Sequence, residues 1–324
     1  MDAIATVDYH TAGEPFRIVT GGVRPLRGRT ILEKRRDALE HRDDVRRLLI
    51  HEPRGHADMY GCFVTEPEDE GADLGVVFFH NEGYSTACGH GTIALVTWAL
   101  ETGVVAGPEV VVDAPSGRLE CVAVRNGGRV ESVRFRNVPS FVLATGLEIG
   151  GVTLDVAYGG AFYGSVDVSS LGLCVRPSDL PRLIALQREL RPAIDAAVEV
   201  VHPLEPELHG IYGIVFYEEK QEAPELRQRN VTVFADGEVD RSPCGSGTSA
   251  RLALLHAADR IGIGEPLRHV SIVDTEFVGR VVATAEVAGR PAVVTEVEGS
   301  AYLTGRHEFV LADGDPLGTG FLLR

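Results

Sequence analysis

The sequence predicts an α+β protein of two pseudo-symmetric domains, each a curled mixed β-sheet around a central helix. The first observation is a repeated motif, because Cys88-Gly-His-Gly-Thr92 returns in the second half of the chain as Cys244-Gly-Ser-Gly-Thr248. The second is that the run after each motif is apolar around most of its circumference, which is typical of a helix buried on nearly all sides. The third is a series of short alternating or β-branched runs, which favour strands.

The expected elements follow in chain order. Strands are predicted at Ile4 to Val7, Arg17 to Thr20, Val76 to Phe79, Glu109 to Val112, Val130 to Phe135, Val231 to Phe234, Val278 to Thr284 and Ala292 to Val297. Helical spacing occurs at Ile31 to Leu49, after each motif, and at Ser178 to Val198, where a break is expected near Pro192. Thr86 and Ser242 are the expected caps of the two motif-led helices, and Gly103 and Gly262 their expected ends.

The domain boundary is expected near residue 150, between the two copies of the motif. The first domain would then span residues 1–150, completed by residues 299–324, and the second would span 151–298. A chain of 324 residues with 44% hydrophobic content can bury the cores of two such domains.

The composition narrows the class of partner. The formal net charge of −16 argues against nucleic acid or an anionic membrane surface, since both would repel the chain. A small-molecule substrate is expected instead. The five cysteines form no CxxC pair, and no signal peptide or membrane-spanning run is evident, so we expect a cytoplasmic protein.

The two motif cysteines are the candidate catalytic residues. A cysteine in the first turn of a helix lies among unpaired backbone N–H groups at the positive end of the helix dipole, which is expected to lower the thiol pKa. The same N–H groups bind anions, and the glycine after each cysteine, Gly89 or Gly245, lets a ligand approach the backbone. If the halves face each other, the expected ligand is the carboxylate of an amino acid.

Such a site suits removal of a weakly acidic Cα proton. Backbone donors on the carboxylate would stabilise the enolate-like charge that develops. One thiolate, such as Cys88, would take the proton from one face while the thiol of Cys244 gives one to the other face, which inverts Cα. This chemistry requires neither a metal nor pyridoxal phosphate, and no cofactor is expected.

Five segments of the chain resemble the proline racemase family. They are Asp8 to Val19, the two cysteine motifs with the preceding Asp240 to Pro243, Tyr158 to Tyr163, and Gly299 to Gly305. The resemblance implies a family that includes proline racemases, 4-hydroxyproline 2-epimerases and trans-3-hydroxy-L-proline dehydratases, with the two-domain fold of diaminopimelate epimerase. It leaves open whether the active unit is a monomer or a homodimer.

The resemblance also implies roles for individual residues. Cys88 and Cys244 would be the acid/base pair, and Asp240 would bind the ring ammonium of the substrate. The carboxylate would be held chiefly by backbone N–H groups of four residues: Gly89, His90, Gly245 and Ser246.

Two departures bear on the subgroup. Gly213 stands where some hydroxyproline epimerases carry a histidine, and the segments Glu52 to Gly61 and His80 to Ser85 look more like the dehydratase branch. Dehydratases, however, typically carry threonine in place of Cys244. We therefore expect a 4-hydroxyproline 2-epimerase, with a trans-3-hydroxy-L-proline dehydratase that has epimerase side activity as the first alternative and a proline racemase as the second.

Two further classes compete with these. The run from Gly245 to Ala250 fits a loose dinucleotide fingerprint, which would indicate a nicotinamide oxidoreductase, but a polar, kinked segment stands where a buried strand should precede the first glycine. A binding protein with this fold and no turnover is the other alternative. The retention of both thiols argues against it.

Overall fold

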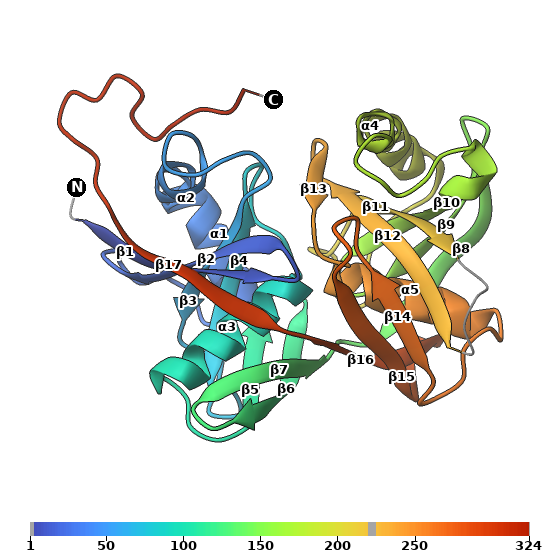
Figure 1. Cartoon of the computed structure of the whole chain (residues 1–324), viewed down its shortest axis with the longest axis horizontal. Helices are drawn as coiled ribbons and strands as arrows, with labels where there is room; N and C mark the ends of the chain where they lie inside the picture. Colours follow the sequence, from blue (N-terminus) through green and yellow to red (C-terminus); the bar gives the residue numbers. More distant parts are fainter. Residues whose placement is uncertain (1–2, 220–224, 324) are drawn as a thin grey trace. The chain divides into compact units, whose positions relative to one another are not determined.

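The computed structural model describes residues 3–219 and 225–323, and their contacts divide the chain into two compact units (Figure 1). Unit 1 comprises the described residues of Met1–Val133 and Ser300–Arg324, and unit 2 comprises Arg134–Gly299. This division differs from the boundary near residue 150, because β8 (Ser140–Ile149) pairs with strands of unit 2.

Unit 1 is built on a mixed sheet. Its strands are β1 (Ile4–Thr11), β2 (Glu14–Gly21), β3 (Tyr60–Thr65), β4 (Leu74–His80), β5 (Glu109–Ala114), β6 (Gly117–Asn126), β7 (Arg129–Arg136), which crosses the division, and β17 (Ala301–Phe309). Antiparallel pairs join β17 to β1, β1 to β2, β3 to β4 and β5 to β6, whereas β2 pairs with β3 and β4 with β5 in parallel.

The helix α3 (Gly89–Thr102) is the core of unit 1. Every residue from Gly89 to Leu100 is buried, and the helix packs on β1, β2, β3, β6 and β17. It ends where Gly103 adopts the left-handed conformation, as the sequence predicted. The all-round apolar character of the segment is therefore explained by burial on every side.

The helix expected from Ile31 to Leu49 is two helices, α1 (Ile31–His41) and α2 (Asp43–Ile50), which pack on β4. Thr30 and Glu33 form a capping box that starts α1. The break falls at Arg42, whose φ of −137° lies outside the helical region.

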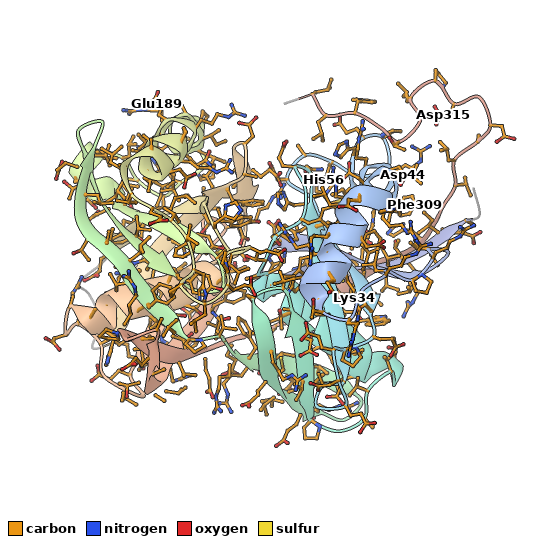
Figure 2. The ribbon with its side chains drawn as sticks, turned by 180° about the vertical axis from the view of Figure 1, so that it is seen from behind. Lys34, Asp44, His56, Glu189, Phe309 and Asp315 are labelled. Atoms are coloured by element: carbon orange, nitrogen blue, oxygen red, sulfur yellow. The ribbon has the colours of Figure 1, made fainter. Side chains whose placement is uncertain are left out.

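The end of the chain returns to unit 1. β17 pairs with β1 along its length, and the segment that follows runs beside residues 52–54, where the backbones of Glu52 and Phe321 exchange two hydrogen bonds of 3.0 Å. Arg54 donates to Asp315 at 2.9 Å. Figure 2 shows Asp315 on this segment, beyond Phe309 at the end of β17.

Unit 2 is a sheet that closes on itself. Its strands are β8, β9 (Val152–Tyr158), β10 (Phe162–Asp167), β11 (Ile211–Glu219), β12 (Leu226–Phe234), β13 (Glu238–Asp240), β14 (Pro266–Val270), β15 (Glu276–Val287) and β16 (Arg290–Gly299). Pairing runs β8–β9–β10–β11–β12–β14–β15–β16, and β16 returns to β8. The pairs β10–β11 and β12–β14 are parallel, and the others are antiparallel.

The helix α5 (Gly245–Ala257) lies inside this closed sheet, against β8, β9, β10, β15 and β16, and is buried from Gly245 to Leu255. It ends at Ala257, capped by Ala258, rather than at the expected Gly262. A short 3₁₀ helix, η1 (Val168–Leu171), follows β10.

The helix α4 (Leu180–Ala197) packs outside the sheet on β11 and β12. The break expected near Pro192 is absent, since the helix continues through this residue. The lost backbone donor removes one hydrogen bond, while Leu190 and Ile194, on either side, remain buried. Within residues 3–219 and 225–323, no helix is both long and apolar enough to cross a membrane.

Candidate active site

Cys88 is itself the N-terminal cap of α3, so the cap expected at Thr86 is wrong by two residues. The backbone N–H of Gly91 donates to Cys88 Sγ at 3.3 Å, and the carbonyl of Cys88 accepts from the N–H and the hydroxyl of Thr92 at 2.9 and 2.8 Å. A Cβ on Gly91 would lie 2.7 Å from the sulfur. Glycine at this position thus lets the thiol sit over the first turn of the helix.

The ring of His90 lies beside the same thiol. Its two nitrogens are 3.6 and 3.5 Å from Cys88 Sγ, and Phe16 and Tyr60 pack edge-on against the ring, with centroids 5.6 and 5.0 Å away. The sequence did not single out Tyr60, which comes from β3. Among the residues that the structure describes, no group of three or more His, Cys, Asp or Glu side chains could hold a metal ion.

Cys244 is the cap of α5, in place of the expected Ser242. Its φ of 60° lies in the left-handed region, which non-glycine residues rarely adopt. The carbonyl of Cys244 accepts from Thr248 N–H at 2.7 Å, and its own N–H donates to Ser242 Oγ at 3.1 Å. Ser242 therefore supports the turn that carries the cysteine, although it does not cap the helix.

Two hydroxyl groups approach the sulfur of Cys244. Tyr163 Oη, from β10, lies 3.8 Å from Sγ, and Ser246 Oγ lies 3.9 Å from it. The two hydroxyls are 2.7 Å apart and hydrogen-bonded to each other. Tyr163 lies within a family-like segment of the sequence, but nothing in the sequence indicated its contact with the thiol.

The first turns of α3 and α5 carry the backbone donors that the sequence predicted would bind a carboxylate. The N–H groups of Gly89 and His90 in α3, and of Gly245 and Ser246 in α5, belong to the helix positions that have no intrahelical acceptor. Each unit thus places a thiol next to an anion-favouring helix terminus.

Asp240 ends the three-residue strand β13 and is 4% exposed. Its Oδ1 accepts from the N–H of Ser242 at 2.8 Å. Burial raises the pKa of this carboxyl to about 6, and the hydrogen bonds from Ser242 only partly oppose the shift. Asp240 therefore changes charge close to neutral pH.

The lowered thiol pKa expected from the helix dipole is wrong for Cys244. Burial, and next the negative charge of Asp240, raise its pKa to about 12, although hydrogen bonds from Gly247, Thr232 and Tyr163 act in the opposite direction. Desolvation of the sulfur outweighs the helix terminus. Cys244 is consequently a protonated thiol at neutral pH, which suits a proton donor rather than a base.

The chain matches known proteins over nearly its whole length. A family model described as proline racemase matches residues 6–322. A trans-3-hydroxy-L-proline dehydratase of Bacillus cereus is 47% identical, covering 98% of this chain and 97% of the relative. A 3-hydroxyproline 2-epimerase of Burkholderia multivorans is 46% identical, covering 99% and 98%. The crystal structure of a hydroxyproline epimerase from Agrobacterium vitis, with bound trans-4-OH-L-proline, superposes with a TM-score of 0.91 at 32% identity, covering 99% and 96%.

Proposed function

Because the chain belongs to the proline racemase family, we propose that it removes the Cα proton of trans-3-hydroxy-L-proline and that loss of the 3-hydroxyl is the main outcome. The observation that carries the proposal is the position of Cys88 and Cys244, each the N-terminal cap of a buried helix. Thiols in this position stand next to donors that can hold the carboxylate of an amino acid.

The proposed binding groups are those of the two helix termini. Backbone N–H groups of Gly89, His90, Gly245 and Ser246 hold the substrate carboxylate and stabilise the charge that spreads onto it when the Cα proton leaves. The carboxylate of Asp240 pairs with the ring ammonium. Burial disfavours the charged form of Asp240. The ring ammonium of the substrate would supply an opposite charge that stabilises this form.

Elimination then needs one thiol. Cys88, as thiolate, takes the Cα proton, the electron pair forms the Cα–Cβ double bond, and the C3–O bond breaks. In the trans substrate the hydroxyl and the Cα hydrogen lie on the same ring face, so the proton gained by Cys88 can pass to the departing oxygen, which leaves as water. The enamine that remains tautomerises to a ring imine. Net loss of water requires no second catalytic group.

Three features support a 3-hydroxyproline over the 4-hydroxyproline expected first. The two relatives described above that are named for 3-hydroxyproline are 46 and 47% identical, against 32% for the structure with the bound 4-hydroxy isomer. Segments 52–61 and 80–85 resemble the dehydratase branch of the family. At Gly213, a Cβ would lie 2.8 Å from the carbonyl oxygen of Val233. A histidine that reads a 4-hydroxyl therefore does not fit there without movement of β12.

The second candidate is 2-epimerisation of a 3-hydroxyproline, and Cys244 favours it. This thiol is protonated at neutral pH and can deliver a proton to the planar carbanion. The carbanion formed by Cys88 would then partition between expulsion of the hydroxyl and protonation by Cys244. Proline racemase and 4-hydroxyproline 2-epimerase activities would share the same first step.

Proton NMR in D₂O tests the proposal directly. The enzyme is incubated separately with trans-3-hydroxy-L-proline, trans-4-hydroxy-L-proline and L-proline, and the Cα–H signal is followed. We expect the 3-hydroxy substrate to give the ring imine fastest, with the C2 epimer as a minor product. A C2 epimer from the 4-hydroxy substrate, with no reaction of the 3-hydroxy one, would overturn the proposal.

The pH dependence should report Asp240. Since the ammonium binds the ionised carboxylate, kcat/KM should fall about tenfold per unit as the pH drops below about 6. The bound cation lowers the pKa of Asp240, so kcat should hold to a lower pH. Asp240→Asn should raise KM and remove the acidic limb of the profile. A limb near pH 6 that persists in this variant would assign it to another group.

The same shift predicts a trend in stability. In the folded protein, the pKa of Asp240 is raised from its ordinary value of 3.8 to about 6. The folded state therefore holds the proton more tightly than the unfolded state. The contribution of Asp240 to the free energy of unfolding is therefore present in full below pH 4 and is lost as the pH rises to about 6. Asp240→Asn should flatten this part of the stability profile in urea.

A further inference from the structure

In each unit, an arginine from an outer helix donates to the turn that precedes the cysteine. In unit 1, Arg46 of α2 is 5% exposed, and its Nη1 donates to the carbonyl of His80 at 2.7 Å and to that of Asn81. This turn leaves β4 and leads to Cys88. His51 Nε2 also lies 3.1 Å from the Asn81 carbonyl oxygen.

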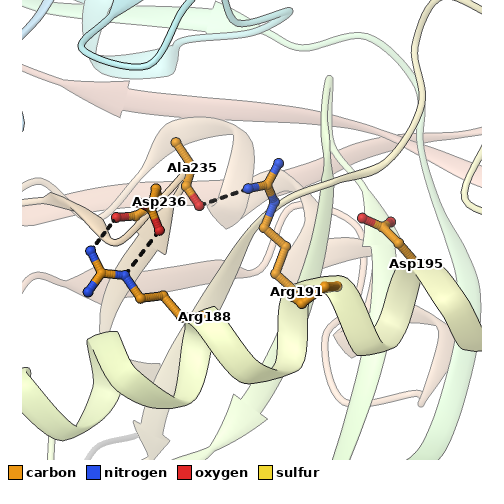
Figure 3. A pocket seen from close by; sticks show the side chains of 6 residues that line it. Arg188, Arg191, Asp195, Ala235 and Asp236 are labelled. Atoms are coloured by element: carbon orange, nitrogen blue, oxygen red, sulfur yellow. Dashed lines mark hydrogen bonds and ion pairs between the residues drawn. The ribbon is translucent and has the colours of Figure 1, made fainter.

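In unit 2, three side chains of α4 donate to the turn between β12 and β13. Figure 3 shows two of them, Arg188 and Arg191, beside Ala235 and Asp236. Gln187 Nε2 and Arg191 Nη1 donate to the carbonyl of Ala235 at 3.0 and 2.9 Å. Arg188 donates to the carbonyl and the carboxylate of Asp236 at 2.8 and 3.1 Å. Arg191 Nε donates in addition to the carbonyl of Ile211 at 2.8 Å, which ties the turn to the start of β11.

The turn of unit 2 needs such support because its backbone is strained. Ala235 has a φ of 44° and Cys244, further along the chain, a φ of 60°, both in the left-handed region that is unfavourable for a residue with a side chain. The three-residue strand β13, which ends at Asp240, leads from this turn toward Cys244. A shift of the turn would therefore also move Asp240 and Cys244.

The two turns occupy equivalent places in their units. Each follows a strand that is antiparallel to one neighbour and parallel to the next: β4 lies between β3 and β5, and β12 between β11 and β14. In each case the first carbonyl after the strand, that of Asn81 or Ala235, accepts from the arginine.

We propose that Arg46 and Arg191 are positioning residues, each of which fixes the strand-to-helix turn ahead of one cysteine and so sets the placement of that thiol independently of the other. The inference rests on the proposed roles of the thiols for its effect on turnover. Its effect on the thiols themselves does not depend on the reaction.

The test measures alkylation of each cysteine by iodoacetamide, with the labelled peptides quantified by mass spectrometry. Arg191→Ala should raise the rate at Cys244 roughly tenfold, because loss of the partly buried hydrogen bonds to Ala235 and Ile211 lets the turn open, while the rate at Cys88 stays unchanged. Arg46→Ala should do the reverse. Arg191→Lys, which retains a donor, should give an intermediate rate at Cys244 and serves where the alanine variant folds poorly.

Arg182→Ala is the matched control, since Arg182 is an exposed arginine at the start of the same helix. It should leave both rates at their wild-type values. Equal rates at Cys244 in wild type, Arg191→Ala and Arg191→Lys, or a parallel change at both cysteines, would overturn the inference.

Turnover provides the second readout. Arg191→Ala should lower the yield of C2 epimer relative to dehydration product by roughly tenfold, whereas a merely structural defect would lower both in proportion. If the wild type proves to have no activity on any of the three imino acids, the proposed function fails, yet the alkylation rates still decide on the positioning role.

Discussion

Replacing Cys88 with serine should abolish both dehydration of trans-3-hydroxy-L-proline and exchange of its Cα proton with D₂O. The serine hydroxyl occupies the same place at the cap of α3 but has no accessible anion near neutral pH. We expect a loss of at least about 10³-fold in kcat, within the range that general-base catalysis contributes. The measurement is the NMR assay in D₂O, with the Cα–H signal and the ring imine followed together.

Cys174→Ser is the control for this variant, because Cys174 is a partly buried cysteine outside both helix termini. It should retain full activity. Exchange of the Cα proton at the wild-type rate in Cys88→Ser would remove Cys88 from the role of base and reassign the first step.

Cys244→Ser should separate the two outcomes of the reaction. Formation of the C2 epimer should fall about 10²- to 10³-fold, since the opposite ring face loses its proton donor, while dehydration should remain within about tenfold of the wild type. Serine is preferred to threonine here, because the left-handed φ of Cys244 disfavours a β-branched side chain. The ratio of epimer to imine, measured from one spectrum, is the decisive quantity.

An equal loss of epimer and imine in Cys244→Ser would assign Cys244 to the elimination itself, for instance as the acid that protonates the departing hydroxyl. Wild-type levels of epimer would show that water, rather than the thiol, protonates the carbanion. Either result contradicts the proposed division of labour between Cys88 and Cys244.

The sequence was most informative about the two buried central helices. The helices α3 and α5 were predicted because their segments are apolar on all sides, and the structure buries both against the strands of their units. The eight predicted strands are all present. Among the strands that were missed are exposed ones such as β6 and β17, whose many polar residues weaken the pattern, and buried ones such as β3 and β10.

The errors at the site arose from properties that depend on three-dimensional surroundings. The helix dipole is a local feature and could be read from the motif, but the desolvation of Cys244 and its proximity to the charge of Asp240 depend on the packing of β12 and β13. The contact of Tyr163 with the thiol likewise comes from a strand distant in sequence. Caps were misplaced because cysteine is an unusual capping residue, whereas Thr86 and Ser242 are common ones.

The pairing of β1 with β17 has a consequence for the order in which the chain matures during vectorial synthesis. Unit 2 is one uninterrupted stretch, so it can fold as soon as it has left the ribosome, whereas β1 must wait for the last strand to be translated. Until then the nascent first unit presents an open strand edge, which is prone to pair with another chain. The unit that is synthesised first is therefore completed last. During synthesis, unit 1 is the unit at risk of pairing with another chain.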